Sequence, residues 1–308
     1  MIYRPTCPTN TPPSQRQMAV ITCHFNWQGF SRPRQNLHRF LRQMDAAGIP
    51  VFGIEALLPG QPSQTMGRAG WHQVLVNLHG VMFQKEALLN AVLKFVPPQF
   101  DRIAWVDADV WFTNPHWFDI TNSLLGTAAV VQPFSHAIWT GKDGQDQYSL
   151  PGAAKAASSD PLVGHPGFAM AARRSLFDTG AGLFDGSITG QGDIHFFAAV
   201  SGNKLRHNDL RGLGANHVPY YRWRDAVRRW MASEGGVIAA APGTVVHEWH
   251  GDRTTRNYVG RHNSIEATFD YDRHLKRTPD GWTQWTEEAP AAMMAAVAAY
   301  FSERKEDG

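Results

Sequence analysis

The segment RIAWVDADVWF, residues 102–112, is an apolar run interrupted by two carboxylates, Asp107 and Asp109. Ile, Trp and Val favour a buried β-strand. Ionised carboxylates at the end of such a strand are costly unless a cation meets them. Because side chains two apart on a strand point to the same side, we expect Asp107 and Asp109 to bind one divalent metal at the edge of a sheet. That metal could in turn hold a diphosphate.

The flanking sequence predicts the rest of an α/β fold. An apolar strand at 18–25, a helix at 35–47 and a second strand at 49–57 form a βαβ unit, which requires a parallel sheet. The helix places its apolar side chains on one face, at Leu37, Phe40, Leu41 and Met44. Further elements are expected as a strand at 71–78, a helix at 81–96, a helix after 114, a strand at 127–134 and a helix after the loop that begins at 189.

Three segments stand apart from this pattern. Residues 1–17 are rich in Pro, Thr and Gln and predict a disordered tail. Residues 140–165 are polar and rich in small side chains, which predicts a long mobile loop. Residues 286–308 predict a C-terminal helix with acidic residues in its first turn and basic residues in its last.

Composition limits the class of protein. The chain has 308 residues, a net charge of +2 and only two cysteines, with no CxxC pair. A disulfide framework is therefore excluded, and a cysteine zinc site is disfavoured. We find no run of about 20 apolar residues and no apolar leader, so we expect a soluble cytoplasmic protein, which includes the cytoplasm of a phage-infected bacterium.

A second motif is VVHEWHGDRTTRNY, residues 245–258. A neutral imidazole of His247 at the end of an apolar strand could complete the metal shell begun by the two aspartates. Arg253 and Arg256 could neutralise phosphate oxygens. The alternative for His247 is a packed or surface imidazole. The spacing HxxH is not HExxH, so a zinc-protease helix is not supported.

A third motif is GQGD, residues 190–193. Gly190 and Gly192 would allow the backbone to pass close to a ligand. Asp193 could act as a general base or accept hydrogen bonds from sugar hydroxyls. It could equally cap the helix that follows, and the two roles are compatible.

The order of these motifs resembles that of GT-A-fold glycosyltransferases, the DxD-containing enzymes that use nucleotide sugars. The resemblance extends over residues 18–285 and implies a twisted, mixed and mostly parallel sheet flanked by helices. It implies a nucleotide-sugar half at 18–120 and an acceptor half at 121–285. It also implies Mn²⁺ or Mg²⁺, a UDP-sugar donor such as a UDP-hexose, and a hydroxyl acceptor.

The resemblance assigns roles to individual residues. VVHEWHG is similar to the metal segment of glycogenin-type transferases, which implies that His247 binds metal and Arg253 meets the diphosphate, although the usual Lys-Pro-Trp after that segment is missing. GQGD is similar to a segment of inverting galactosyltransferases, which implies that Asp193 is the base. These two likenesses imply opposite stereochemistry. The remaining residues implied to lie near the nucleotide or donor sugar are His24, Asn26, Lys85 and Asn90.

The acceptor is not fixed by these motifs. A bacterial glycan is the first expectation. Residues 219–233 interleave arginines with Tyr and Trp, which keeps open hydroxymethylated bases in DNA, because such side chains contact phosphates and stack on bases. A solvated helix face is the competing interpretation of the same segment. A nucleotidyltransferase and a non-catalytic sugar-binding module are the other classes considered.

Overall fold

The computed structural model describes residues 17–156, 162–252, 254–258 and 260–308. Its main sheet has seven strands in the order β10-β6-β9-β4-β1-β2-β3. Strand β9 runs antiparallel to both of its neighbours, and every other pair in this sheet is parallel. The predicted α/β class, a GT-A-like, mixed and mostly parallel sheet, is thereby confirmed. The strands are β1 Met18–Phe25, β2 Val51–Leu57, β3 Trp71–Leu75, β4 Arg102–Val106, β6 Val130–Gln132, β9 Ala169–Arg173 and β10 Ile238–Ala240.

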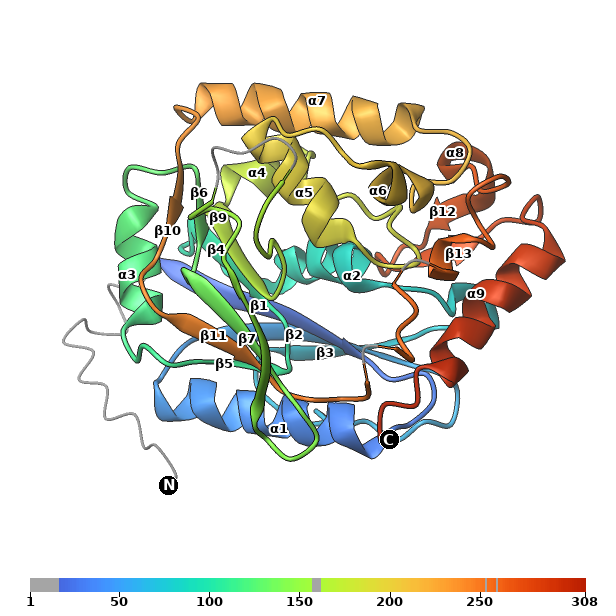
Figure 1. Cartoon of the computed structure of the whole chain (residues 1–308), viewed down its shortest axis with the longest axis horizontal. Coiled ribbons are helices and arrows are strands. Elements are labelled where there is room, and N and C mark those ends of the chain that lie inside the picture. The colour runs from blue at the N-terminus through green and yellow to red at the C-terminus, as the bar shows by residue number, and fades with distance from the viewer. Residues whose placement is uncertain (1–16, 157–161, 253, 259) are drawn as a thin grey trace.

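Helices cover both faces of this sheet (Figure 1). Alternate residues of β1 point to opposite faces, so Ala19 and Ile21 belong to one apolar cluster and Met18 and Val20 to another. The first cluster includes side chains of α2, α5 and α7, and the second includes those of α1. Their bounds are α1 Ser31–Ala46, α2 Lys85–Val92, α5 Gly192–Ser201 and α7 Val218–Ser233. Shorter helices are α3 Trp117–Leu124, α4 Ser175–Asp178, α6 His207–Arg211 and α8 Tyr271–His274.

The predicted strand 102–112 is in fact two strands in different sheets. Strand β4 ends at Val106, and β5 (Val110–Phe112) joins a four-stranded sheet in the order β5-β11-β7-β8. Asp107 and Asp109 therefore lie in the turn between β4 and β5, rather than on one strand. The expectation that both carboxylates point to the same side because they are two apart on a strand is wrong for this reason. The other strands of the second sheet are β11 Thr244–His247, β7 His136–Thr140 and β8 Asp146–Pro151.

The long loop expected at 140–165 is largely an ordered hairpin. Strands β7 and β8 pair in antiparallel fashion, and the Gly141 amide donates to the carbonyl of Gln145 to close the turn. Polar residues at an exposed edge give no apolar alternation, so the sequence pattern could not reveal a strand that is held by backbone hydrogen bonds. Residues 157–161 of the expected loop lie outside the described residues, as do residues 1–16 of the expected tail.

Two predicted helices are shorter than expected. Helix α2 begins at Lys85 instead of Val81 and passes into a 3₁₀ turn (Leu93–Phe95). The C-terminal helix, α9, spans Ala291–Glu303; its first turn carries no acidic residue and its last turn carries no basic residue. Pro290 precedes it, so the predicted charge pattern lies outside the helix. A two-stranded sheet, β12 Leu275–Arg277 with β13 Thr283–Trp285, packs near it.

Helix α9 joins the body of the fold through buried side chains, because Tyr300 and Phe301 belong to the same apolar cluster as Ile21 of β1. The division of the chain into a donor half and an acceptor half stays a prediction. None of the described helices combines the length and the apolar character that crossing a lipid bilayer requires.

Candidate active site and metal centre

A cavity of about 510 Å³ opens where β1, β4 and β11 end. Ligand sites of open α/β sheets occur outside the carboxyl ends of the strands, so this is the expected position. Nine of the residues singled out from the sequence line this cavity. They are His24, Lys85, Asp107, Asp109, Gly190, Gly192, Asp193, His247 and Arg256.

One end of the cavity holds a lysine between two carboxylates. Lys85 Nζ lies 2.7 Å from Asp107 Oδ1 and 2.9 Å from Asp193 Oδ1. Burial acts to lower the pKa of Lys85, but the charges of Asp107, Asp193 and Glu86 together hold that pKa well above its usual value. Burial also raises the pKa of Asp107 to about 7, against the opposing effect of Lys85. We call this group, Lys85 with Asp107 and Asp193, the lysine bridge.

The other end gathers three side chains with metal-binding atoms. Asp109 Oδ2 lies 2.8 Å from His250 Nε2 and 3.6 Å from His247 Nε2, and the two imidazole nitrogens are 3.2 Å apart. We call Asp109, His247 and His250 the metal triad. Asp107 is bound by Lys85 and lies outside this group, so the group differs from the predicted ligands Asp107, Asp109 and His247, and that ligand set stays a prediction. His250 takes the third place.

These distances fit a divalent cation. Two ligand atoms that are each about 2.1 Å from one ion lie about 3.0 Å apart in octahedral geometry, and about 3.4 Å apart in tetrahedral geometry. The second oxygen of Asp109, Oδ1, is buried and has no hydrogen-bond partner among the described residues. Burial lowers the pKa of His247 to about 4, so its ring is neutral near pH 7. A mixed carboxylate and imidazole set suits Mn²⁺ and related ions.

Strand pairing explains why the triad assembles. Strand β11 pairs antiparallel with β5, and its register sets His247 opposite Val110, the residue after Asp109. The Glu248 amide continues this ladder by donating to the carbonyl of Asp109 at 2.8 Å. The chain then turns, so His250 faces His247 again. The spacing HxxH was the only sequence signal for His250, and it gains its meaning from this turn.

The backbone of the GQGD segment turns through positive φ angles before α5. Gly190 has a φ of 93° and Gln191 a φ of 78°, and α5 begins at the next residue. A Cβ on Gly192 would lie 1.8 Å from Oε1 of Glu86, so only glycine fits beside that buried carboxyl group. Burial raises the pKa of Glu86 to about 8.

Asp193 lies in the first turn of α5 and lines the cavity. The N-cap of this helix is Gln191 and no side chain caps it, so the predicted capping role of Asp193 is wrong, whereas its role as a base or hydrogen-bond acceptor stays a prediction. Its Oδ1 is held by Lys85. Its Oδ2 faces Gly167, where an added Cβ would lie 2.9 Å away. An added Cβ at Gly167 would also lie 3.0 Å from Nε2 of His165, so glycine at this position lets both side chains approach the backbone closely.

Two residues with predicted donor-binding roles do not line the cavity. Asn26 binds the backbone of Phe30 through both side-chain atoms, at 2.7 and 2.9 Å, and so holds its own loop. Asn90 makes two similar bonds to the backbone of Leu183 and joins two segments of the core. Asn26 and Asn90 thus hold backbone segments of the fold, and the donor-binding roles suggested for them stay predictions. Arg253 lies outside the described residues.

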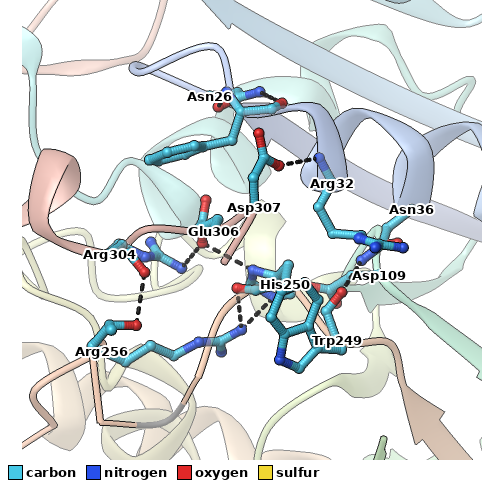
Figure 2. A network of polar contacts seen from close by, with 12 residues as sticks. Asn26, Arg32, Asn36, Asp109, Trp249, His250, Arg256, Arg304, Glu306 and Asp307 are labelled. Carbon is cyan, nitrogen blue, oxygen red and sulfur yellow. Dashed lines mark hydrogen bonds and ion pairs between the residues drawn. The ribbon is translucent and has the colours of Figure 1, made fainter. Parts of the chain in front are cut away.

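Further polar residues of the cavity come from two late segments of the chain, and of these the sequence had indicated Arg256 but neither Arg304 nor Glu306. Figure 2 shows Glu306 between Arg304 and His250, with Arg256 on the other side of the His250 ring. Glu306 is buried, and burial acts to raise its pKa, but Arg304 and His250 lower that pKa to about 2. Arg256 Nη2 lies 2.7 Å from His250 Nε2. Arg256, Arg304 and Glu306 all line the cavity.

The aromatic and basic segment 219–233 forms α7, whose aromatic side chains mostly point inward. Tyr220 and Trp230 are buried, and Trp230 donates to the hydroxyl of Ser175. Trp223 donates to the carbonyl of Ala181. These rings therefore pack in the core and are not available to stack on nucleic-acid bases.

No family model and no curated protein matches this chain. Solved structures do share its fold. A Drosophila β1,4-galactosyltransferase 7 variant in complex with manganese, UDP-Gal and xylobiose is 12% identical, with 91% of this chain and 98% of that chain covered and a TM-score of 0.40. Glucosyl-3-phosphoglycerate synthase from Mycobacterium tuberculosis, in complex with Mn²⁺, UDP and phosphoglyceric acid, is also 12% identical, with 89% and 87% covered and a TM-score of 0.40.

A third similar structure is the 4-diphosphocytidyl-2C-methyl-D-erythritol synthase of Anaerococcus prevotii, at 10% identity, with 73% and 88% covered and a TM-score of 0.35. Identities and scores at this level carry no argument about the reaction. The function of this chain has to be argued from its own site.

Proposed function

We propose that this protein is a metal-dependent glycosyltransferase that moves a hexose from a UDP-sugar to a hydroxyl group of a bacterial glycan. One observation carries the proposal: the metal triad and the lysine bridge line the same cavity. The first provides a place for a cation, and the second holds a carboxylate beside open space. Together they supply what transfer from a nucleotide-activated donor requires.

The donor end is the metal triad. Asp109, His247 and His250 would hold Mn²⁺ or Mg²⁺, which when bound supplies positive charge to stabilise a departing diphosphate. Arg256 is a cation of the same cavity, within hydrogen-bonding distance of His250. Its guanidinium can bind phosphate oxygens in bidentate fashion, the role that the sequence suggested for Arg253.

The acceptor end is the lysine bridge. Lys85 fixes Oδ1 of Asp193, and this leaves Oδ2 to take the proton of an acceptor hydroxyl that enters the cavity. Lys85 also binds Asp107, so the turn after β4 and the start of α5 are held by one side chain. Lys85 therefore orients the base and keeps it at a fixed distance from the metal triad.

A glycan acceptor is favoured over DNA because most aromatic side chains of α7 are packed inside the protein, Tyr221 being exposed. A nucleotidyltransferase would use a similar metal site, but would attack the α-phosphate and release pyrophosphate. The identity of the phosphate product therefore separates these two reaction classes.

The test is to incubate the purified protein with a panel of UDP-sugars and Mn²⁺ and to measure UDP and pyrophosphate separately. We expect UDP to be released from one donor, release to stop when EDTA is added, and the melting temperature to rise only with that donor and metal together. Release of pyrophosphate from a sugar phosphate and a nucleoside triphosphate would replace the proposal with nucleotidyl transfer. The absence of both product and thermal shift with every donor would contradict the proposed glycosyltransferase activity.

A further inference from the structure

The residues that follow α9 fold back onto the metal triad (Figure 2). Glu306 is only 8% exposed, although it follows the last helix by three residues. Its Oε1 lies 2.9 Å from Nδ1 of His250 and 2.5 Å from Nη2 of Arg304. A buried carboxylate thus contacts the imidazole from the side opposite to Asp109.

The two nitrogens of His250 have different partners. Nε2 faces Asp109, His247 and Arg256, whereas Nδ1 faces Glu306. An ionised carboxylate has only acceptors, so the contact of Glu306 requires a proton on Nδ1. At Nε2, Arg256 can only donate and Asp109 can only accept, so the contacts there do not select a tautomer. The proton of a neutral ring is then on Nδ1, where Glu306 accepts it. This is the tautomer that presents Nε2 to a metal.

The segment is held in place on both sides of Glu306. Asp307 accepts hydrogen bonds from the backbone amides of Ser31 and Arg32 at the start of α1, at 3.0 and 2.7 Å. The hydroxyl of Thr255 donates to the carbonyl of Arg304 at 2.7 Å. Because these anchors come from distant parts of the sequence, they fix where Glu306 lies relative to the triad.

We propose that Glu306 is a positioning residue for the metal site, and that the strap, residues 304–307, delivers it. Glu306 binds Nδ1 of His250, orients the ring and increases the basicity of Nε2. Carboxylate groups that act in this way behind a metal-binding histidine change metal affinity by about 10- to 100-fold. The inference rests on the proposed metal site, and it adds a residue that does not itself touch the ion.

The experiment measures Mn²⁺ affinity by calorimetry in the full chain, without any donor. Glu306→Leu removes the hydrogen bond and the charge, so we expect about 100-fold weaker binding. Glu306→Gln keeps the shape and an acceptor oxygen but loses the charge, so we expect about 10-fold weaker binding. The matched control is Glu303→Gln, an exposed carboxylate in the last turn of α9, which should bind like the wild type.

A second measurement reports which nitrogen of the His250 ring carries the proton. Proton–nitrogen correlation spectra of the metal-free protein should show His250 protonated at Nδ1 in the wild type and in Glu306→Gln. In Glu306→Leu we expect a mixture that includes protonation at Nε2. A general loss of packing would lower the melting temperature without selecting one tautomer of one ring.

The outcomes separate the two proposals. A wild-type protein that fails to bind Mn²⁺ would overturn the proposed metal site itself. A wild type that binds, with Glu306→Leu and Glu306→Gln binding equally well, would overturn only the role of Glu306. If Glu306→Leu does not fold, the affinity of Glu306→Gln relative to Glu303→Gln decides.

Discussion

Asp107 and Asp109 are separated by a single alanine, yet their carboxylates contact partners of different chemistry. Asp107 meets a permanent cation, Lys85, and belongs to the lysine bridge. Asp109 meets two imidazoles and keeps one buried oxygen without a partner among the described residues. A carboxylate paired with lysine already has its counter-ion. A carboxylate beside two imidazole nitrogens that can bind metal is suited to bind an added cation. The same residue type therefore serves two functions within one turn.

The strongest test of this contrast compares Asp109→Asn with Asp107→Asn. Loss of a metal-binding carboxylate should weaken Mn²⁺ binding by more than the effect of a residue behind the ligands, so we expect about 1000-fold or more for Asp109→Asn. We expect less than about 10-fold for Asp107→Asn, because Lys85 and not the metal is its partner. Calorimetric titration with Mn²⁺ measures both. Equal losses would mean that both aspartates bind the ion.

Asp193→Asn tests the lysine bridge as the acceptor end. An amide cannot take the proton of a hydroxyl group, so we expect kcat to fall by about 100-fold or more, while Mn²⁺ affinity stays unchanged. Initial rates of UDP release at saturating donor give kcat. Asp225→Asn on α7 is the control, because this carboxylate is exposed and remote from the cavity. A normal rate for Asp193→Asn would remove Asp193 from the reaction.

Lys85→Met tests what the bridge contributes to stability. The variant leaves Asp107 and Asp193, both about three-quarters buried, without their shared cation. We expect the free energy of unfolding to fall by about 2 kcal/mol, a discounted value because neither carboxylate is fully buried. Urea titration measures the loss, with Lys94→Met as an exposed control. Adding Asp107→Asn to Lys85→Met should recover part of it, and strict additivity of the two changes would argue against the pairing.

Glu86 provides the most local effect. Its pKa is about 8 in the folded protein against an ordinary value of 4.5. Between these two pH values the folded protein therefore holds a proton on Glu86 that the unfolded chain has released. The contribution of Glu86 to stability is complete below pH 4.5 and is lost as the pH rises through 8, at about 1.4 kcal/mol per pH unit. Glu86→Gln should remove this slope from urea titrations between pH 5 and 8, and Glu287→Gln should not. An unchanged slope in Glu86→Gln would show that another group titrates.

The sequence predicted much of the fold because its signals are local. The strand Met18–Phe25 has the predicted bounds, and the apolar positions Leu37, Phe40, Leu41 and Met44 are buried as the helical period requires. The prediction failed at β8, a polar edge strand, and within 102–112, where one apolar run serves two sheets. Periodicity records which side chains are buried, but it does not record which sheet the backbone joins.

The sequence by itself determined which chemical groups are present and near which strand ends they occur: aspartates after β4, a histidine at the end of β11, and glycines before Asp193. Only the tertiary structure decided which of those groups contact one another. Lys85 pairs with Asp107, whereas Asp109 contacts His250, which in turn contacts Glu306. The physical reason is that a charge selects its partner by distance in space. Glu306 is 56 residues from His250 along the chain but 2.9 Å from it in the fold, and no local pattern encodes that approach.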